Sequence, residues 1–283
     1  MTVNLEPRAT QNHGQLRTTG NLEREATGNG RRHVADDTPE LPRSLAAAWG
    51  LRERPGKGPK RGLSLEQIVR AALTVAAADG LAAVSMSRVA AELGVGTMSL
   101  YRYVDSKRDL LDLMVDTAMG PPRPADPSAS WREGMSGWAW AQLASYRDNL
   151  WAVQIPISGP PATPNALGWL ETALFYMRRT RLDEGQKMSV ILLTSSFVRS
   201  EATLEAQLDS AVRAVGQSPS DLMAGYNKFL ASVLDPQRFP ELVTVAASGV
   251  LGKADDPDDE FAFGLERILD GVDVLVRSFG GED

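Results

Sequence analysis

The chain has 283 residues, of which 43% are hydrophobic and 23% charged, a composition typical of a folded protein with a buried core. Cysteine is absent, and the two histidines, His13 and His33, lie near the N-terminus. These absences exclude disulfides, a cysteine nucleophile and imidazole-based metal or Ser-His sites in the rest of the chain. The net charge of −6 is uneven: residues 1–62 hold 11 Lys and Arg against 7 Asp and Glu, whereas residues 121–283 hold 14 against 22. We expect no metal site, no cofactor and no catalytic residue.

The first 62 residues are predicted to form a disordered tail that ends in a basic arm. Residues 1–43 are rich in Thr, Gly, Asn, Arg and Glu, and hold too few apolar residues to offset the entropy of ordering the backbone. Ser44–Trp49 is predicted to form one helical turn capped by Ser44. Five basic residues follow within Arg52–Arg61, which indicates either a cationic arm for a partner or a solubilising linker.

Residues 63–120 are predicted to form a small domain of four short helices. Their limits follow from serine caps at the starts and from glycine or Asp-Ser breaks at the ends. In chain order, the predicted helices are 64–79 with Gln67 completing a capping box, Ser85 to Gly94, Gly96 or Thr97 to about Tyr103, and Ser106 to Gly120.

The second and third of these helices have the layout of a helix-turn-helix. Ala90 is small where the two helices must cross, and Gly94 supplies the left-handed turn between them. Leu100 and Val104 are predicted to point inward. The remaining side chains form a short polar and aromatic face that fits the major groove of DNA: Thr97, Met98, Ser99, Tyr101, Arg102 and Tyr103.

This stretch has two other interpretations. Gly94–Ser99 approximates the dinucleotide-binding glycine fingerprint, but it lacks the third glycine and follows a helix instead of a strand. An ordinary helical hairpin without DNA is the second alternative. The Tyr-Arg-Tyr sequence at 101–103, close to Lys107, favours DNA binding over both.

Residues 64–119 resemble the DNA-binding domain of TetR-type transcriptional regulators. The resemblance rests on Val-Ala-Ala-Glu-Leu-Gly-Val at 89–95, Ser-Leu-Tyr-Arg-Tyr-Val at 99–104 and Ser-Lys-Arg-Asp-Leu-Leu at 106–111. It implies a homodimer that reads a palindromic operator and carries a C-terminal domain for ligand binding and dimerisation. By position it implies DNA contacts by Thr97, Met98, Ser99, Tyr101 and Tyr103, phosphate contacts by Ser85, Ser87 and Lys107, and either kind by Arg102.

Residues 121–283 are predicted to form a larger helical domain after a linker at Pro124–Ser130. Its helices are expected near 131–151, 164–180, 184–213, 219–234, 239–249 and 258–279. Since no useful alternating β pattern occurs, the chain is predicted to be all-α, with an N-terminal helix-turn-helix domain and this larger C-terminal domain.

Aromatic residues concentrate at the start of the C-terminal domain, where five of the six tryptophans lie between 131 and 169. Core packing is one interpretation, but a glutamine on the same helix face indicates an apolar cavity for a small hydrophobic or aromatic effector. The tetracycline repressor uses histidine to help hold a drug–magnesium complex, and residues 121–283 contain none, which argues against tetracycline. The candidate ligand residues are Trp131, Met135, Trp138, Gln142, Tyr146 and Trp169.

Two apolar helices are candidates for a dimer interface. The last helix, 258–279, carries a long apolar stripe, and 219–234 carries another. Such stripes pack either on their own core or on a partner. The resemblance matches these helices by order to the pair that builds the family's four-helix dimer, so we predict the interface there.

The sequence thus predicts a ligand-responsive transcriptional regulator, most simply a repressor. The N-terminus lacks the charged and then apolar segments of a signal peptide. The longest uncharged run, 149–170, is interrupted by prolines, so we expect a cytoplasmic protein without a membrane segment. The alternative is an all-α small-molecule-binding protein or enzyme that uses acids such as Glu171, Asp183, Glu184 or Glu201. Nothing in the sequence pairs those acids with a nucleophile or with a metal-ligand spacing.

Overall fold

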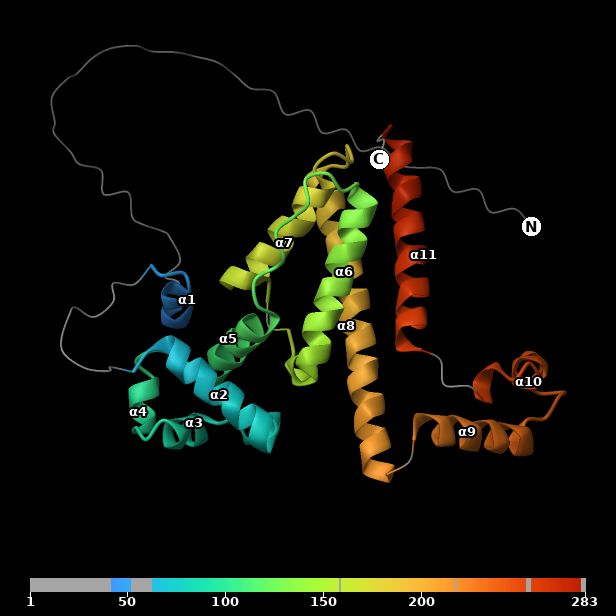
Figure 1. Cartoon of the computed structure of the whole chain (residues 1–283), viewed down its shortest axis with the longest axis horizontal. Coiled ribbons are helices and arrows are strands. Elements are labelled where there is room, and N and C mark those ends of the chain that lie inside the picture. The colour runs from blue at the N-terminus through green and yellow to red at the C-terminus, as the bar shows by residue number, and fades with distance from the viewer. Residues whose placement is uncertain (1–41, 52–62, 158, 217, 253–255, 281–283) are drawn as a thin grey trace, which may run out of the picture. The chain divides into compact units, whose positions relative to one another are not determined.

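The computed structural model describes residues 42–51, 63–157, 159–216, 218–252 and 256–280. Every regular element in these residues is helical, which confirms the all-α class (Figure 1). The helices are α1 (Arg43–Ala48), α2 (Leu65–Asp79), α3 (Met86–Glu92), α4 (Thr97–Leu100), α5 (Lys107–Met119), α6 (Trp131–Asp148), α7 (Pro164–Met177), α8 (Glu184–Val215), α9 (Pro219–Val233), α10 (Pro240–Ala247) and α11 (Pro257–Ser278), with 3₁₀ turns η1 (Leu81–Ala83), η2 (Leu150–Gln154) and η3 (Val250–Gly252). The predicted tail at 1–41 and basic arm at 52–62 lie outside the described residues.

Capping side chains explain where the helices begin. The predicted capping box of α2 is confirmed, because the Ser64 hydroxyl accepts from the Gln67 N–H at 3.2 Å while the Gln67 side-chain Oε1 accepts from the Ser64 N–H at 2.9 Å. The same reciprocal arrangement starts α6 at Ser130 and α8 at Asp183. Local sequence therefore sets these boundaries before any tertiary contact is made.

Three elements differ from the sequence-based prediction. Helix α1 begins after Pro42, so Ser44 lies inside the helix and does not cap it. Helix α4 ends at Leu100, and residues 101–103 form a turn instead of a further helical turn. Helix α6 ends at Asp148, because Asn149 adopts a non-helical backbone and its side-chain amide caps the Ser145 carbonyl oxygen at 3.3 Å.

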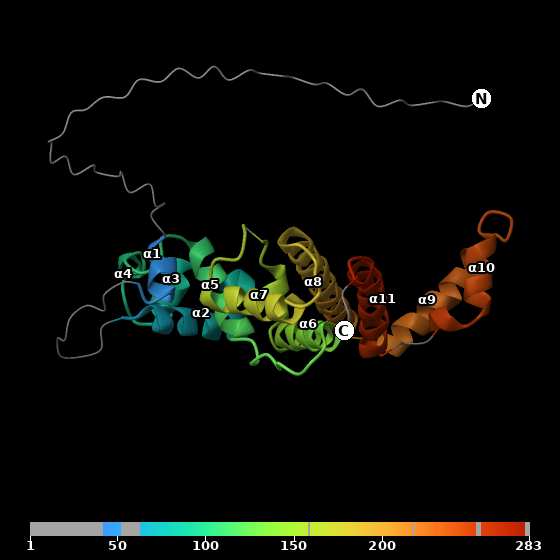
Figure 2. The ribbon, with the colours of Figure 1, turned by 90° about the horizontal axis from the view of Figure 1, so that it is seen from above.

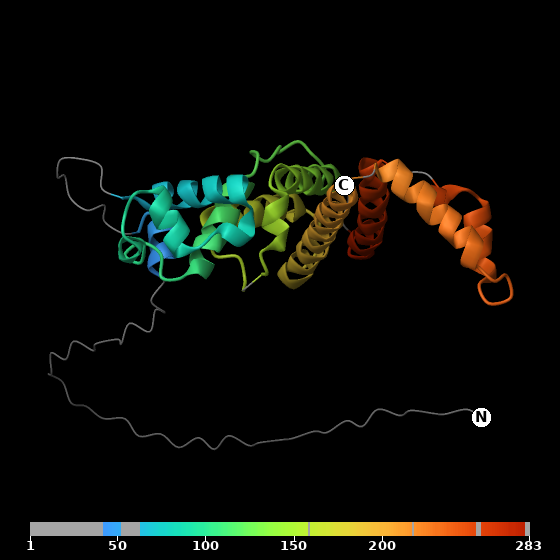
Figure 3. The same ribbon diagram turned by 90° about the horizontal axis from the view of Figure 1, so that it is seen from below.

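The helices build two hydrophobic cores, one for each predicted domain. The first lies among α2, α3, α4 and α5, which Figure 3 shows together, and it includes Ile68, Val75, Val89, Leu100, Leu110 and Met114. The second lies among α6, α7, α8 and α11, whose packing Figure 2 shows from above, and it includes Met135, Leu143, Met177, Val198, Phe261 and Leu269. Burial of these side chains supplies most of the driving force for folding.

Helix α5 joins the two cores. It packs on α2 within the first core and on α6 and α7 of the second. The Asp116 carboxylate accepts from the Ala166 N–H at 3.0 Å, and its backbone carbonyl accepts from the Asn165 side chain at 3.0 Å. The last helix of the first core is therefore bonded to the first turn of α7.

Helix α11 lies antiparallel beside α8 and also packs on α6 (Figure 1). The Phe197 ring of α8 stacks on Phe261 of α11 with centroids 5.3 Å apart, and Gly264 leaves room for it, since a Cβ there would overlap that ring. Within the chain, α9 packs against α10 and η3, whereas α8 packs against α11. The dimer interface predicted on 219–234 and the last helix stays a prediction.

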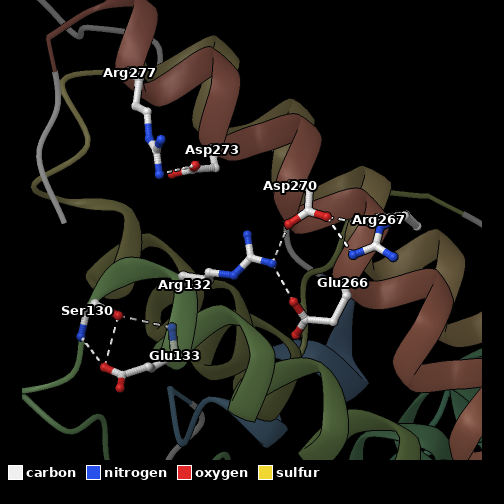
Figure 4. A network of polar contacts seen from close by, with 8 residues as sticks. All are labelled: Ser130, Arg132, Glu133, Glu266, Arg267, Asp270, Asp273 and Arg277. Atoms are coloured by element: carbon white, nitrogen blue, oxygen red, sulfur yellow. Dashed lines mark hydrogen bonds and ion pairs between the residues drawn. The ribbon is translucent and has the colours of Figure 1, made fainter.

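Ion pairs fasten α11 to α6 along its exposed edge (Figure 4). Arg132 bridges Glu266 and Asp270, with 2.7 Å between its Nη2 and the Asp270 Oδ1. Burial opposes the charge of Arg132, but the hydrogen bonds to both acids outweigh it and raise its pKa. Hydrogen bonds from Arg267 and Arg132 lower the pKa of Asp270. Because these pairs are partly exposed to solvent, they add little to the free energy of unfolding, and their main effect is to fix how α11 lies against α6.

Candidate DNA-binding and effector sites

The helix-turn-helix forms as the sequence predicts. Ala90 is buried where α3 and α4 cross, and Gly94 has a φ of 65°, the left-handed conformation that favours glycine. The turn is closed by the Val95 N–H, which donates to the Ala90 carbonyl oxygen at 3.0 Å. This turn fixes the direction in which α4 leaves α3.

The side chains of α4 and the following turn separate into an inner and an outer set. Leu100 and Val104 are fully buried, which confirms that they point inward. Met98 is 76% exposed, and Tyr101 and Arg102 are also exposed. Thr97 and Ser99 are half-buried beside them. The outer set is a short mixed face of hydroxyl, aromatic and cationic groups that suits contact with base edges.

Tyr103 differs from the prediction that it faces outward. Its side chain is half-buried and packs against the core of α2–α5. Because the helix ends at Leu100, the turn that follows swings Tyr103 toward the protein interior. Its ring therefore packs on the core behind the exposed side chains of Tyr101 and Arg102.

Groups suited to phosphate contact flank this face. Ser85 caps α3, accepting from the Arg88 N–H at 3.2 Å, and its Oγ lies 3.2 Å from that of exposed Ser87. Lys107, the first residue of α5, is exposed, and no carboxylate in the described part of the chain forms an ion pair with it. Its ammonium group is therefore available to a DNA phosphate.

Arg88 is a structural residue that the sequence analysis did not single out. Its guanidinium pairs with Glu92 at 2.8 Å and with Asp79 of α2 at 3.0 Å. Its hydrogen bond to Glu92, and to a lesser extent that to Asp79, raises the pKa of Arg88. With its charge matched by two acids, Arg88 holds α3 against α2.

A cavity of about 680 Å³ lies among α1, α5, α6, α7, α8 and the loop that precedes α7. Four of the six predicted ligand residues line it: Trp138, Gln142, Tyr146 and Trp169. A volume of this size accommodates a small organic molecule of several rings.

Two tryptophans shape the apolar wall of the cavity. The Trp138 Nε1 donates to the Trp169 carbonyl oxygen at 2.9 Å, and the Trp169 Nε1 donates to the Gly120 carbonyl oxygen at 3.0 Å. Their rings meet edge to face, with centroids 6.4 Å apart. Because both indole N–H groups are bonded to backbone, the rings are fixed and offer aromatic surface.

Trp131 and Met135 were predicted to line the cavity, and the structure places them elsewhere. Both are buried in the core of α6–α8 and α11, at the beginning of α6, outside the cavity lining. The helical stripe identifies the buried face of α6. It does not reveal that the cavity adjoins only the second half of that helix.

Several cavity residues come from α5, which sequence reasoning assigned wholly to the DNA-binding domain. Arg108, Asp112 and Asp116 line the cavity together with Asp109. Arg108 donates to the Pro156 carbonyl oxygen and pairs with Asp112 at 3.2 Å. The four-residue spacing of these charges predicts a pair within α5, and it does not reveal that this face of the helix borders a cavity.

Arg199 of α8 is a further cavity residue that was not predicted. Its Nη2 donates to the Val153 carbonyl oxygen at 2.9 Å and to the Ile155 carbonyl oxygen at 2.6 Å, and its Nη1 reaches the Tyr146 hydroxyl at 3.5 Å. It thereby holds the loop at the cavity edge. Within the described residues, no three His, Asp or Glu side chains gather closely enough to hold a metal ion.

The match to known families is clear for both domains. Residues 68–114 match the family model described as "Bacterial regulatory proteins, tetR family", and residues 123–276 match "Tetracyclin repressor-like, C-terminal domain". Together they define a ligand-responsive DNA-binding regulator. The chain belongs to the TetR family.

Relatives and solved structures agree with this assignment. The chain is 37% identical over 246 residues to the HTH-type transcriptional repressor DrrR1 of Streptomyces coeruleorubidus, covering 86% of this chain and 89% of that protein. It is 26% identical to the repressor Rv1353c of Mycobacterium tuberculosis, covering 80% and 88%. The structure resembles ActR of Streptomyces coelicolor in complex with actinorhodin, with a TM-score of 0.63, 29% identity, and 75% of this chain and 96% of that chain covered. No helix in the described residues is long and apolar enough to cross a membrane.

Proposed function

We propose that this chain is a repressor that binds a palindromic operator as a homodimer and releases it when a small hydrophobic or aromatic molecule fills the cavity. Residues 63–120 would bind DNA, and 121–283 would bind the effector and dimerise. The proposed DNA contacts are Ser85, Ser87, Thr97, Met98, Ser99, Tyr101, Arg102 and Lys107, with Tyr103 supporting them.

One observation carries the proposal: α5 belongs to both sites. Its first residue, Lys107, is exposed next to the DNA-facing turn, while the next residue, Arg108, lines the cavity, as does Asp116 two turns later. A molecule that alters the packing of α5 in the cavity also moves the group that faces DNA. Effector and DNA then favour different positions of α5, which couples their binding in opposition.

The cavity walls favour a flat aromatic effector with polar atoms at its edge. Trp138 and Trp169 offer ring surface, and Gln142 and Tyr146 offer polar contacts on one side. ActR, 28–29% identical, has been solved with actinorhodin and with (S)-DNPA. These complexes support a small organic effector in this chain as well.

We propose a dimer interface that includes α11, as the sequence predicts, but with α8 in place of 219–234, because α8 packs beside α11. Both helices expose large apolar side chains: Leu204 and Leu208 on α8, and Phe263 and Val274 on α11, with Phe263 63% and Val274 71% exposed. Unpartnered apolar surface of this kind marks an interface, and two such helices from each copy form a four-helix bundle. Two copies would place two α4 helices against the two halves of a palindrome.

The enzyme alternative has no support in the geometry. None of Glu171, Asp183, Glu184 and Glu201 lines the cavity. Asp183 caps α8 at 2.8 Å from the Gln186 N–H, and Glu184 pairs with Lys187 at 2.8 Å. Asp183 and Glu184 therefore have structural partners, and none of the four acids faces the cavity.

The proposal is tested by fluorescence anisotropy with DNA from upstream of the chain's own gene, with and without actinorhodin. We expect binding about a thousandfold tighter than to random DNA, and at least roughly fivefold weaker binding in saturating actinorhodin without added magnesium. Equal affinity for both DNAs would refute operator recognition. Unchanged operator affinity, while tryptophan emission reports bound actinorhodin, would refute release.

A further inference from the structure

Helix α1 lies outside both family-model matches, yet it docks at the cavity. It precedes the DNA-binding match, which starts at residue 68. The Arg43 N–H donates to the Asp105 carboxylate at 3.0 Å, and the Trp49 Nε1 donates to the Ala162 carbonyl oxygen at 2.9 Å. The helix therefore spans from the DNA-binding unit to the loop at the cavity edge.

A buried hydroxyl on α1 has no partner. Ser44 is 1% exposed and lies in the cavity wall beside Leu45. Its Oγ makes no hydrogen bond to the described part of the chain. An unpaired buried hydroxyl opposes folding, so it is retained most readily where a second molecule supplies the missing bond.

Three other polar groups of the cavity wall contrast with Ser44. The Ser195 hydroxyl donates to the Ile191 carbonyl oxygen at 2.7 Å, within its own helix. The Arg108 and Arg199 guanidinium groups are bonded to loop carbonyl oxygens. The Ser44 hydroxyl is buried and has no such bond to the described residues.

We propose that α1 is a wall of the effector site and that the Ser44 hydroxyl hydrogen-bonds a polar atom of the bound molecule. This inference rests on the proposed effector function. It narrows the ligand to an aromatic compound that carries a hydroxyl or carbonyl group at the edge facing α1, as opposed to a plain hydrocarbon. The segment before the two family domains then takes part in ligand selection.

The absence of cysteine from the chain permits a direct test of where position 44 lies. In the full-length chain, Ser44→Cys is labelled with benzyl methanethiosulfonate, with Ser232→Cys on exposed α9 as the matched control. We expect Cys at position 44 to react about tenfold more slowly, because the site must open locally, and its benzyl group to change tryptophan emission. Labelling at the control rate, or without an emission change, would overturn the placement of α1 in the cavity wall.

The hydrogen bond is tested with two probes of nearly equal shape, 2-naphthol and 2-methylnaphthalene, titrated against tryptophan emission. Ser44→Ala is expected to weaken 2-naphthol binding by about three- to tenfold and to change 2-methylnaphthalene binding by less than about twofold. Ser189→Ala, whose hydroxyl donates to the Gly185 carbonyl oxygen at 2.9 Å and lies outside the cavity lining, is the control and should change neither. The ligand-free Ser44→Ala chain should melt at a higher temperature, because the unpaired hydroxyl is gone.

The outcomes separate this inference from the proposed function. Equal effects of Ser44→Ala on both probes, or none, would overturn the Ser44 contact while leaving an effector cavity in place. Failure of both probes to bind the unsubstituted chain would count against the cavity as an effector site, and the labelling result would still decide whether α1 forms its wall.

Discussion

At the scale of single residues, Lys107 and Tyr101 illustrate two kinds of DNA contact. Lys107 is an exposed cation with no ion pair in the described residues, so it can attract a phosphate but does not distinguish one base from another. Lys107→Ala is expected to weaken binding to operator and random DNA alike and to reduce the salt dependence by about one phosphate contact. The measurement is anisotropy over a range of salt concentrations.

Lys228→Ala, on exposed α9, is the matched control and should leave DNA affinity unchanged. Tyr101→Ala provides the contrast, because an exposed ring with a hydroxyl can distinguish bases. It should lower discrimination against altered operators by about 1–3 kcal/mol. A loss confined to the operator for Lys107→Ala would contradict a phosphate contact.

Glu201 makes the stability of the fold depend on pH. Burial raises the pKa of Glu201, and the charges of Glu205 and Glu260 add to this effect. Because the folded-state pKa lies above the unfolded one, ionised Glu201 opposes folding at neutral pH, and this penalty is relieved as the pH falls through the raised pKa. Glu201→Gln should therefore raise the urea midpoint at pH 7 and change it little near pH 4.

The comparison uses urea unfolding followed by tryptophan emission at both pH values. Glu171→Gln, which alters an exposed acid on α7, controls for the change in net charge. A gain of equal size at both pH values would show that desolvation of the Glu201 carboxylate is not the cause.

Residue-level expectations held where local chemistry decides them. The inward positions of Leu100 and Val104 and the cap at Ser64 follow from periodicity and capping, and the structure confirms them. Trp131 was misplaced because the cavity adjoins only the second half of α6, and Tyr103 because α4 ends at Leu100. A helical stripe cannot supply that information.

At the scale of elements, the packing of α6 on α7 depends on the absence of a side chain at Gly134. A Cβ there would overlap the Tyr176 ring, which is held in place because its hydroxyl accepts from the Asp126 N–H at 3.1 Å. Gly134→Ala is expected to lower the free energy of unfolding by about 1–3 kcal/mol through overpacking. Urea unfolding measures the change.

Gly137→Ala, one turn further along α6, is the matched control. A Cβ at Gly137 meets nothing within 4 Å, so the substitution should stabilise the helix by up to about 1 kcal/mol. Opposite signs at the two positions are the expected result. Destabilisation at both would mean that close approach of Tyr176 is not the cause.

Element boundaries were predictable from the sequence, but element partners were not. Caps and breaks placed α7 and α8 within a few residues of their observed limits. The choice of α8 over α9 as the neighbour of α11 depends on contacts such as the Phe197–Phe261 stack. Both α8 and α9 carry apolar stripes, so their patterns alone do not separate them.

At the scale of the whole molecule, the exposed apolar residues of α8 and α11 predict a dimer. Val274→Arg would place an unpaired charge in the proposed interface and is expected to cost several kcal/mol of association energy, giving a folded monomer with weakened operator binding. Leu275→Arg would be less informative, because Leu275 packs against the chain's own core. The measurement is light scattering together with circular dichroism.

Lys228→Arg serves as the control for a surface change on exposed α9 and should leave the oligomeric state unaltered. A Val274→Arg chain that remains a dimer at micromolar concentration would place the interface elsewhere. If the Val274→Arg chain loses its helical circular dichroism signal, the milder substitution Val274→Ser is used instead. Its expected outcome is a weakened dimer.

Communication between the cavity and DNA depends on how α5 is joined to α7. The Asp116 carboxylate accepts from the Ala166 N–H at 3.0 Å, which links the DNA-binding unit to the wall of the cavity. Asp116→Ala is expected to leave DNA affinity without effector, and actinorhodin binding, within about threefold, while reducing the coupling between them from an ordinary 1–3 kcal/mol toward zero. Operator affinity measured at zero and saturating actinorhodin gives the coupling directly. Asp148→Ala, an exposed acid at the end of α6, should retain it in full. Undiminished release of DNA by the Asp116→Ala chain would show that the two sites communicate by a route other than the α5–α7 contact.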